Sequence, residues 1–346
     1  MAASRGRGAR FVDGGQAVSL KEWQGWGTSS PVPLMVSQVI EDLRSLEADA
    51  GSTMSFGGLG GKLQGNFRVQ EDIKNREVYR SLTDYEEKLQ FYAARQVACR
   101  LLGSRGYLCQ KCWIAMEDCM CSKLVKCPLW QKIRFWLYMH PKEFLRQNNT
   151  GKLLWQLFGV QAASLCLFGI REHEEIMWDA FRKSGKNMVW FLYPNQNVTP
   201  MSVKDIIFDN YSTNSEGETM DQKQVNFVLI DGTWSNSAAM YRRLKDGWAA
   251  AWGEKDPPCI SLLSTGASVM HKLRPQPAWD RTCTAAAAAS LLSELHGNPD
   301  LRSLGLDKQA EEVENALGIL LEALTIRRLR MGRSITRRRR HNNNCI

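Results

Sequence analysis

The stretch that decides the fold is an apolar run followed by an acidic turn, Val225-Asn226-Phe227-Val228-Leu229-Ile230-Asp231-Gly232-Thr233-Trp234. Apolar side chains occur on both faces of this run instead of alternating with polar ones. This pattern is typical of a strand in a parallel sheet whose two faces are both covered by helices. Ligands of such open sheets bind beyond the carboxyl ends of the strands, so Asp231 is the first candidate functional residue.

Other short apolar runs have the same character. They lie at residues 133–139, 164–168, 188–193 and 260–264. The segments around them have helical spacing, near residues 142–158, 173–184, 235–246 and 281–296, and a last helix is expected over 307–329. The alternation predicts an α/β fold with a mostly parallel sheet flanked by helices.

Composition divides the chain into four parts. We expect a flexible N-terminal region with one helix, a helix followed by a small cysteine-rich lobe, an α/β catalytic domain and an Arg-rich tail, at residues 1–67, 68–130, 131–326 and 327–346. The first part has its predicted helix at residues 36–48 and an aromatic anchor, Trp23 and Trp26, that is expected to dock on the domain. The second part has apolar residues at helical spacing over 77–102.

The basic charge of the chain is concentrated in its last segment. The formal net charge is +9, and the residues from Arg327 onward contain eight arginines and no acid. Without this tail the charge is 9 − 8, or about +1. A run of arginines indicates either a nuclear-import signal or a non-specific phosphate-binding arm.

The remaining composition is that of a protein with an ordinary core. Its hydrophobic content is 44%, and no apolar run approaches the roughly 20 residues that span a bilayer. The start of the chain lacks the apolar segment of a signal peptide. We therefore expect the nucleus and/or the cytoplasm, with an organelle as an alternative, and no membrane partner. The sequence leaves the oligomeric state open.

Cysteines cluster in the pattern Cys109-x2-Cys112-x6-Cys119-x-Cys121. Without a signal peptide, clustered cysteines are more often metal ligands than disulfides. Four thiolates suit tetrahedral zinc and leave no open coordination position, so we expect a structural zinc site. The alternatives are that these are scattered reduced thiols, or that Cys127 is the fourth ligand. The basic residues expected to stabilise the thiolates are Arg105, Lys111 and Lys123.

Three predicted strand ends carry polar residues. After 133–139 come His140-Pro141-Lys142-Glu143 and then Asn149-Thr150-Gly151-Lys152; after 188–193 come Pro194-Asn195-Gln196; the third is the turn at Asp231. Each alone has a structural explanation, as a helix start, a turn or an N-cap. Because the ends of parallel strands meet at one edge of a sheet, the three together predict a binding cleft.

In this combination and order the motifs resemble those of the DTW-domain family, which contains the tRNA-uridine aminocarboxypropyltransferases. The family pattern joins a CxxC…CxC cluster, an HPxE segment followed by NT, an LYP turn, a DGTWxxA turn and helix, and a late Arg-x-x-P segment before an S-T-x-E-A helix start. The resemblance covers roughly residues 105–296. The matching stretches beside the cysteines are His140-Pro141-Lys142-Glu143, Asn149-Thr150, Leu192-Tyr193-Pro194 and Asp231-Gly232-Thr233-Trp234-Ser235-Asn236-Ser237-Ala238.

The last motif departs from the family pattern. Arg274-Pro275-Gln276-Pro277 is followed by Cys283-Thr284-Ala285-Ala286-Ala287, so Ala286 occupies the position of the family's Glu. If that Glu is an indispensable base or the ligand of the donor's amino group, this chain lacks an essential group. Otherwise the role of the Glu is orientation, or another carboxylate such as Asp231 carries the chemistry.

The resemblance implies that the 3-amino-3-carboxypropyl group of S-adenosylmethionine is transferred to N3 of an unpaired uridine in tRNA. It implies a sheet akin to those of the knotted SPOUT-like methyltransferases. Asp231 is then the catalytic base or the partner of the donor's ammonium group. The residues expected at the donor are Tyr193, Pro194, Thr233, Trp234 and Thr284, and those expected at the tRNA are His140, Glu143, Thr150 and Arg274.

Two other functions stay open on the sequence. An RNA methyltransferase with the same donor differs only in the carbon that faces the nucleophile. A non-catalytic, zinc-containing RNA-binding adaptor is the third hypothesis, and Ala286 favours it.

Overall fold

A sheet of parallel strands forms the centre of the molecule. The computed structural model describes residues 18–57, 62–193, 201–206, 224–263, 268–273 and 282–333. Within them, six strands pair in the order β4-β3-β7-β5-β8-β6, and every pairing is parallel. The strands are β3 (Ile133–Met139), β4 (Ala163–Leu167), β5 (Val189–Leu192), β6 (Met201–Ser202), β7 (Val225–Asp231) and β8 (Cys259–Ser261). The predicted fold class is confirmed.

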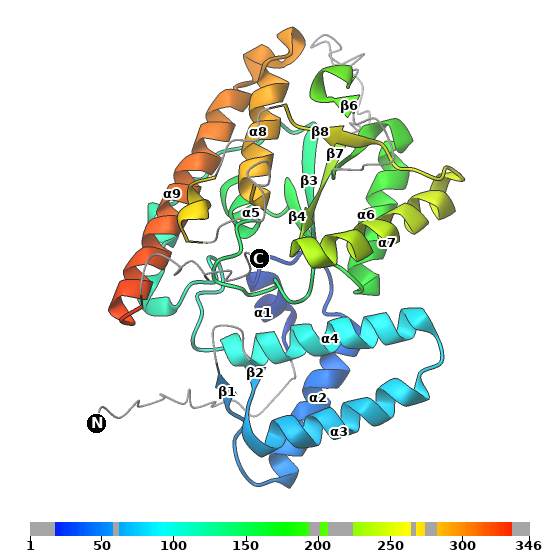
Figure 1. The fold of residues 1–346 in the computed structure, drawn as a ribbon, viewed down its shortest axis with the longest axis vertical. Coiled ribbons are helices and arrows are strands. Elements are labelled where there is room, and N and C mark those ends of the chain that lie inside the picture. Colours follow the sequence, from blue (N-terminus) through cyan, green and yellow to red (C-terminus); the bar gives the residue numbers. More distant parts are fainter. Residues whose placement is uncertain are drawn as a thin grey trace, which may run out of the picture.

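Helices cover both faces of this sheet, as Figure 1 shows. One face is covered by α5 (Lys152–Phe158), α8 (Thr284–His296) and α9 (Leu306–Arg330); the other is covered by α6 (Arg171–Ser184) and α7 (Trp234–Trp252). Successive residues of a strand point to opposite faces. Val225, Phe227 and Leu229 of β7 accordingly pack in the core on the α5 and α8 side, and Val228 packs in the core on the α6 and α7 side. This arrangement explains why the run is apolar on both faces.

The segment after β3 is where a predicted helix is wrong. The spacing predicts a helix over 142–158, but only α5 forms. Residues 140–149 make successive tight turns, in which Glu143 N–H donates to the carbonyl of His140 (2.8 Å) and Arg146 N–H donates to that of Glu143 (3.2 Å). Leu145 has a φ of 55°, a left-handed conformation that an α-helix excludes for an L-residue.

The N-terminal part contains more regular structure than the sequence predicts. The single helix expected at 36–48 is α2 (Leu34–Asp49), and it is preceded by α1 (Leu20–Gly25). Trp23 and Trp26 are 0% and 1% exposed, which confirms the aromatic anchor. The Nε1–H of Trp23 donates to the hydroxyl of Ser30 (3.1 Å), which in turn lies 2.7 Å from Nε2 of His173 on α6. Hydrogen bonds thus join this region to the sheet domain.

The helix predicted over 77–102 is in fact the end of one helix and most of the next. A short hairpin, β1 (Phe56–Gly57) with β2 (Lys62–Leu63), leads into α3 (Gly65–Ser81), and α4 (Tyr85–Ser104) follows after a break. Asp84 makes the break, because its carboxylate accepts a hydrogen bond from Glu87 N–H (3.0 Å) and caps α4. Apolar spacing continues across the break, so periodicity alone did not reveal it. Of the helices that the structure describes, none is both long and apolar enough to cross a membrane.

Candidate active site and metal centre

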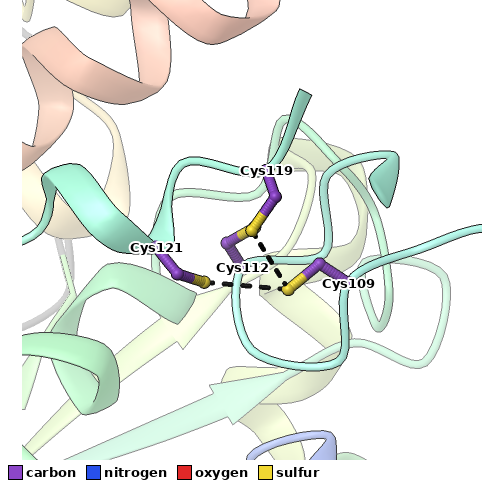
Figure 2. Close-up of side chains that lie close together, drawn as sticks. All are labelled: Cys109, Cys112, Cys119 and Cys121. Carbon is purple, nitrogen blue, oxygen red and sulfur yellow. Dashed lines mark hydrogen bonds between the residues drawn. The ribbon is translucent and has the colours of Figure 1, made fainter. Parts of the chain in front are cut away.

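The four clustered cysteines turn their thiols toward one point, as Figure 2 shows. All four Sγ atoms lie within 4.8 Å of one another. The Sγ of Cys109 lies 3.7 Å from that of Cys121 and 3.5 Å from that of Cys119, and the Sγ atoms of Cys112 and Cys119 are 3.8 Å apart. Tetrahedral zinc with Zn–S bonds of about 2.3 Å separates its sulfurs by roughly 3.8 Å. The cluster can therefore hold a metal ion, and its geometry and donor set fit zinc.

Tight turns build the cluster. Trp113 N–H donates to the carbonyl of Cys109 (2.9 Å), and Trp113 itself has a φ of 55°. Cys109 N–H donates to the carbonyl of Ile114 (2.8 Å), which closes the first knuckle. The second pair of cysteines lies next to two short 3-10 turns, Met116–Asp118 and Cys121–Lys123. Among the described cysteines, Cys127 does not belong to the group, so it is not the alternative fourth ligand.

The cation whose charge acts on the thiols of this cage is Lys152, for which the sequence pattern predicts no role. Lys152, at the start of α5, is 0% exposed, and burial lowers its pKa to about 7 while the thiolates of the cage raise it. Of the predicted cations, Arg105 pairs with Glu22 (2.6 Å) and Lys123 with Glu322 (2.9 Å). The pKa of the Cys112 thiol is lowered, first by a hydrogen bond from Cys121, then by backbone amides and by Lys152.

Asp231 lies at the carboxyl end of β7, in the middle of the sheet, and is 6% exposed. Its Oδ2 accepts a hydrogen bond from Nδ2 of Asn149 (2.8 Å), and its carbonyl accepts one from His140 N–H (2.9 Å). Because residues two apart on a strand share a face, Asp231 is on the same face as Leu229, toward α5 and α8. The structure thus brings together two of the predicted strand ends.

The turns after β3 wrap this carboxylate. The side-chain oxygen of Asn149 accepts a hydrogen bond from Lys152 N–H (3.1 Å), which fixes the amide orientation that Asp231 needs. Gly151 makes room for the carboxylate: a Cβ there would lie 2.3 Å from Oδ2 of Asp231. The hydroxyl of Thr150 accepts a weak hydrogen bond from Ala285 N–H (3.4 Å), and so places the first turn of α8 beside the site.

His140 is held in a neutral form. Burial, followed by the charges of Lys142 and Arg100, lowers its pKa to about 4. Its Nδ1 accepts a hydrogen bond from Lys142 N–H (3.1 Å), so the remaining proton is on Nε2. The ring stacks on Phe168 (centroids 5.8 Å apart), which belongs to the core on the α6 and α7 side, so the ring points to the face of the sheet opposite to the carboxylate of Asp231. At neutral pH, His140 can donate a hydrogen bond but carries no charge.

The other predicted residues are placed less centrally. Tyr193 follows β5, but its ring stacks on Tyr241 of α7 (centroids 4.1 Å apart), on the face of the sheet opposite to Asp231. Glu143 is 2% exposed and forms an ion pair with Arg146.

The donor-site candidates on α7 and α8 lie at the starts of these helices. Thr233 precedes α7, and its hydroxyl is hydrogen-bonded to that of Ser235 (2.9 Å). Trp234 and Thr284 are half-buried in the first turns of α7 and α8. Pro194 and Arg274 lie outside the described residues.

Sequence reasoning missed three residues of the site. The sequence pattern marks the stretch that contains Asn149, Gly151 and Lys152, but it predicts no role for these three residues. A signal for Asn149 is available, because an amide next to a predicted acidic strand end is a natural partner for its carboxylate. No sequence signal places Gly151 or Lys152, since both depend on the three-dimensional approach of β7 and the cysteine cage.

Together, the fold and the site define an α/β protein with a buried carboxylate at the carboxyl edge of a parallel sheet and a four-thiol cage that can hold a metal. Comparison with protein families makes the class specific. The model of the DTW domain matches residues 106–329, which is well over half of the chain, and the protein belongs to the DTW-domain family. This family is consistent with a tRNA-modifying function. No solved structure matches the chain.

Proposed function

We propose that this protein transfers the 3-amino-3-carboxypropyl group of S-adenosylmethionine to N3 of an unpaired uridine in tRNA. The observation that carries the proposal is the buried carboxylate of Asp231, oriented by Asn149 at the carboxyl edge of the sheet of a DTW-domain protein. N3 of uracil carries a proton that must leave before or during attack, and a positioned carboxylate is suited to accept it.

The sulfonium of the donor activates the three carbons bonded to its sulfur, and the site selects among them by position. In the proposed reaction the N3 proton passes to Asp231 and N3 forms a bond to the γ-carbon. The bond from that carbon to sulfur breaks, and its electron pair stays on sulfur. The products are a neutral modified uridine and a neutral thioether, and Asp231 returns its proton to water. The alternative role of Asp231 is to bind the donor's ammonium group.

The surrounding residues suit the two substrates. The neutral ring of His140, on the α6 and α7 side of the sheet edge, offers its Nε2–H as a hydrogen-bond donor to the tRNA. Thr233 and the backbone amides that begin α7 suit the carboxylate of the donor, since helix N-termini favour anions.

The remaining proposed donor contacts come from three elements. Trp234 offers an aromatic surface in the first turn of α7. Thr284 begins α8, next to Thr150. Tyr193 is proposed to contribute through its backbone, because its ring is engaged with Tyr241.

The position of N3 constrains the tRNA. N3 lies on the Watson–Crick edge of uridine, so the base must be unpaired or extruded to react. A tRNA loop recognised by shape and backbone contacts meets this requirement. We assign the zinc cage a structural role, because four thiolates leave no coordination position for a reactant.

The test is a reaction with purified components. An unmodified tRNA transcript is incubated with the full-length protein and S-adenosylmethionine, digested to nucleosides and analysed by mass spectrometry. The proposal expects a uridine that carries an aminocarboxypropyl group. A methylated uridine instead would identify an RNA methyltransferase.

One observation favours a second candidate function, a non-catalytic RNA-binding adaptor. Ala286 lies in the first turns of α8, where the family pattern has a carboxylate, and an alanine cannot contact the donor's amino group. Titration calorimetry with S-adenosylmethionine separates the two functions. Absence of donor binding, with tRNA binding intact, would favour the adaptor over both enzymes.

A further inference from the structure

A cleft of about 1090 Å³ opens between the N-terminal helices and the DTW domain. Its walls come from α3, α4, the turns after β3, the start of α7 and the end of α9. Thr233 and Asn236 lie on its wall, as do Glu143 and Gln147, so the cleft adjoins the candidate active site. The family match begins at residue 106, which places α3 and α4 outside the DTW domain.

The lining of this cleft is strongly basic. It contains nine Lys and Arg side chains and three Asp and Glu side chains, an excess of six positive charges. Seven of the nine are arginines, whose planar fork of donors matches phosphate oxygens. Residues 62–100 supply four of the nine, and the same stretch supplies two of the three acids.

The acids of the cleft are already engaged. Glu71 and Asp72 both pair with Arg95, and Glu143 pairs with Arg146. At the end of α9, Arg327 pairs with Asp118 (3.0 Å), which does not line the cleft. Arg95 and Arg146 thus pair with all three lining carboxylates. Among the other cations, several form no salt bridge with an acid of these walls in the described residues, although the charge of Glu143 also acts on Arg100.

Arg68, Arg100 and Lys142 are the clearest of these cations. None of them forms a salt bridge with a carboxylate in the described parts of the chain. Arg100 donates to the carbonyl of Phe144 (3.2 Å), but its Nε is buried without a partner. A buried donor left unpaired is costly, so a ligand that supplies an acceptor here would be stabilising.

We propose that this cleft binds the sugar–phosphate backbone of the RNA substrate, and that α3 and α4 form a substrate-binding module added to the DTW domain. The inference rests on the proposed function for its choice of RNA. Nine cations spread over several elements of a cleft this large exceed what one phosphate group needs, and they suit a run of phosphates. A backbone held here brings a neighbouring base to the edge of the sheet at Asp231, since phosphate contacts set orientation.

The test measures the affinity of the full-length protein for an unmodified tRNA transcript by fluorescence anisotropy over a range of salt concentrations. The variants are Arg68→Gln and Arg100→Gln. Arg76→Gln and Arg80→Gln are matched controls, because both arginines are exposed on α3 and neither lines the cleft. Arg68 is exposed, so its variant keeps the test informative even if Arg100→Gln impairs folding.

Each cleft variant is expected to weaken binding about threefold to tenfold and to reduce the slope of log affinity against log salt by about 0.7 to 0.9 per lost phosphate contact. The control variants are expected to bind as the wild type does. Equal affinities and slopes for Arg68→Gln and Arg76→Gln would overturn the proposal, as would tighter, Arg68-dependent binding of poly-glutamate in place of tRNA.

The readouts separate this proposal from the proposed function. If the cleft variants lose tRNA binding while the wild type transfers no aminocarboxypropyl group, the cleft stands and the reaction fails. If the wild type performs the transfer and the cleft variants keep both its affinity and its KM for tRNA, the reaction stands and the cleft fails.

Discussion

Gly151 leaves the space in which the carboxylate of Asp231 lies. A Cβ at this position would stand 2.3 Å from Oδ2, closer than any contact allows. Gly151→Ala should displace Asp231 or the turn that holds Asn149, at a cost of about 1 to 3 kcal/mol typical of overpacking. Donor binding and transfer should fall together, as measured by calorimetry and by nucleoside analysis.

Gly318 is the matched control for this substitution. It lies within α9 and a Cβ there would meet nothing within 4 Å. Gly318→Ala should leave transfer unchanged and stabilise the fold by up to about 1 kcal/mol, because alanine favours a helix over glycine. Equal behaviour of the two variants would show that the space at Gly151 has no role.

Asp231 is the residue on which the chemistry is proposed to depend. Asp231→Ala should abolish detectable transfer, since loss of a positioned base typically costs about a hundredfold to ten-thousandfold in rate. A thermal melting point near that of the wild type would show that the fold is retained. Turnover at the wild-type rate would remove Asp231 from the mechanism.

Among individual residues, the sequence best predicts the positions of those that follow the ends of strands. Asp231 and the stretch from His140 to Thr150 follow different strands, yet the rule that parallel strands end at one edge brings their main chains together. Tyr193 follows a neighbouring strand, but its ring points to the opposite face. The face on which a side chain lies depends on strand register to a single residue, and apolar runs that are buried on both faces do not reveal that register.

At the scale of elements, the cysteine cage is the most distinct unit. Cys112 is buried, and its thiol converges with three others. Cys112→Ser should lose zinc and stability together, because metal binding closes a loop too small to fold alone. Metal content by atomic absorption and thermal melting give the two readouts.

Cys127→Ser controls for the loss of a thiol as such. Cys127 is half-buried and lies outside the cage, so this variant should keep its metal. Loss of zinc from Cys127→Ser, or its retention by Cys112→Ser, would show that the ligand set is wrongly assigned.

Long elements could be predicted from periodicity, but their interruptions could not. The five predicted strands, α2 and α9 lie within a few residues of the predicted positions. The break between α3 and α4 comes from the cap at Asp84, and the turns after β3 come from the left-handed Leu145. Both are local backbone features that apolar spacing does not encode. Strands of two residues, such as β6, are too short to form a pattern.

At the scale of the whole molecule, His173 helps to hold the N-terminal region against the sheet domain. Its Nδ1 accepts a hydrogen bond from Leu167 N–H (3.2 Å), and its Nε2 faces Ser30. Burial lowers its pKa to about 3. Because the folded-state value lies below the ordinary 6.5, the unfolded chain binds the proton first. The stability contribution is complete above pH 6.5 and is lost as the pH falls from there toward 3.

His173→Gln should therefore reduce the pH dependence of stability. In the wild type this histidine adds a slope of at most about 1.4 kcal/mol per pH unit below its unfolded pKa. Urea unfolding at pH 7.5 and at pH 5 measures the free energy of unfolding of the wild type and of the variant. At pH 7.5 the difference between them reports the hydrogen bonds that the substitution removes. An unchanged pH dependence in the variant would contradict this account.

The sequence pattern predicts the parallel sheet of this molecule but not its basic cleft. The parallel sheet and the family follow from the apolar runs and from the motifs at their ends. The cleft does not, because its cations are scattered over residues 62–333 and only folding brings them together. Charge outside the tail appears almost balanced in the composition, but the fold gathers six cations from residues 62–146 with Arg327, Arg328 and Arg333 of the tail into one basic cleft.

The proposed transfer is tested by labelling two different groups of the donor separately. Purified full-length protein and an unmodified tRNA transcript are incubated in parallel reactions with S-adenosylmethionine radiolabelled either in its carboxylate or in its methyl group. The tRNA is expected to acquire the carboxylate label and not the methyl label. Methyl label in the tRNA, or no label from either donor, would contradict the proposed transfer.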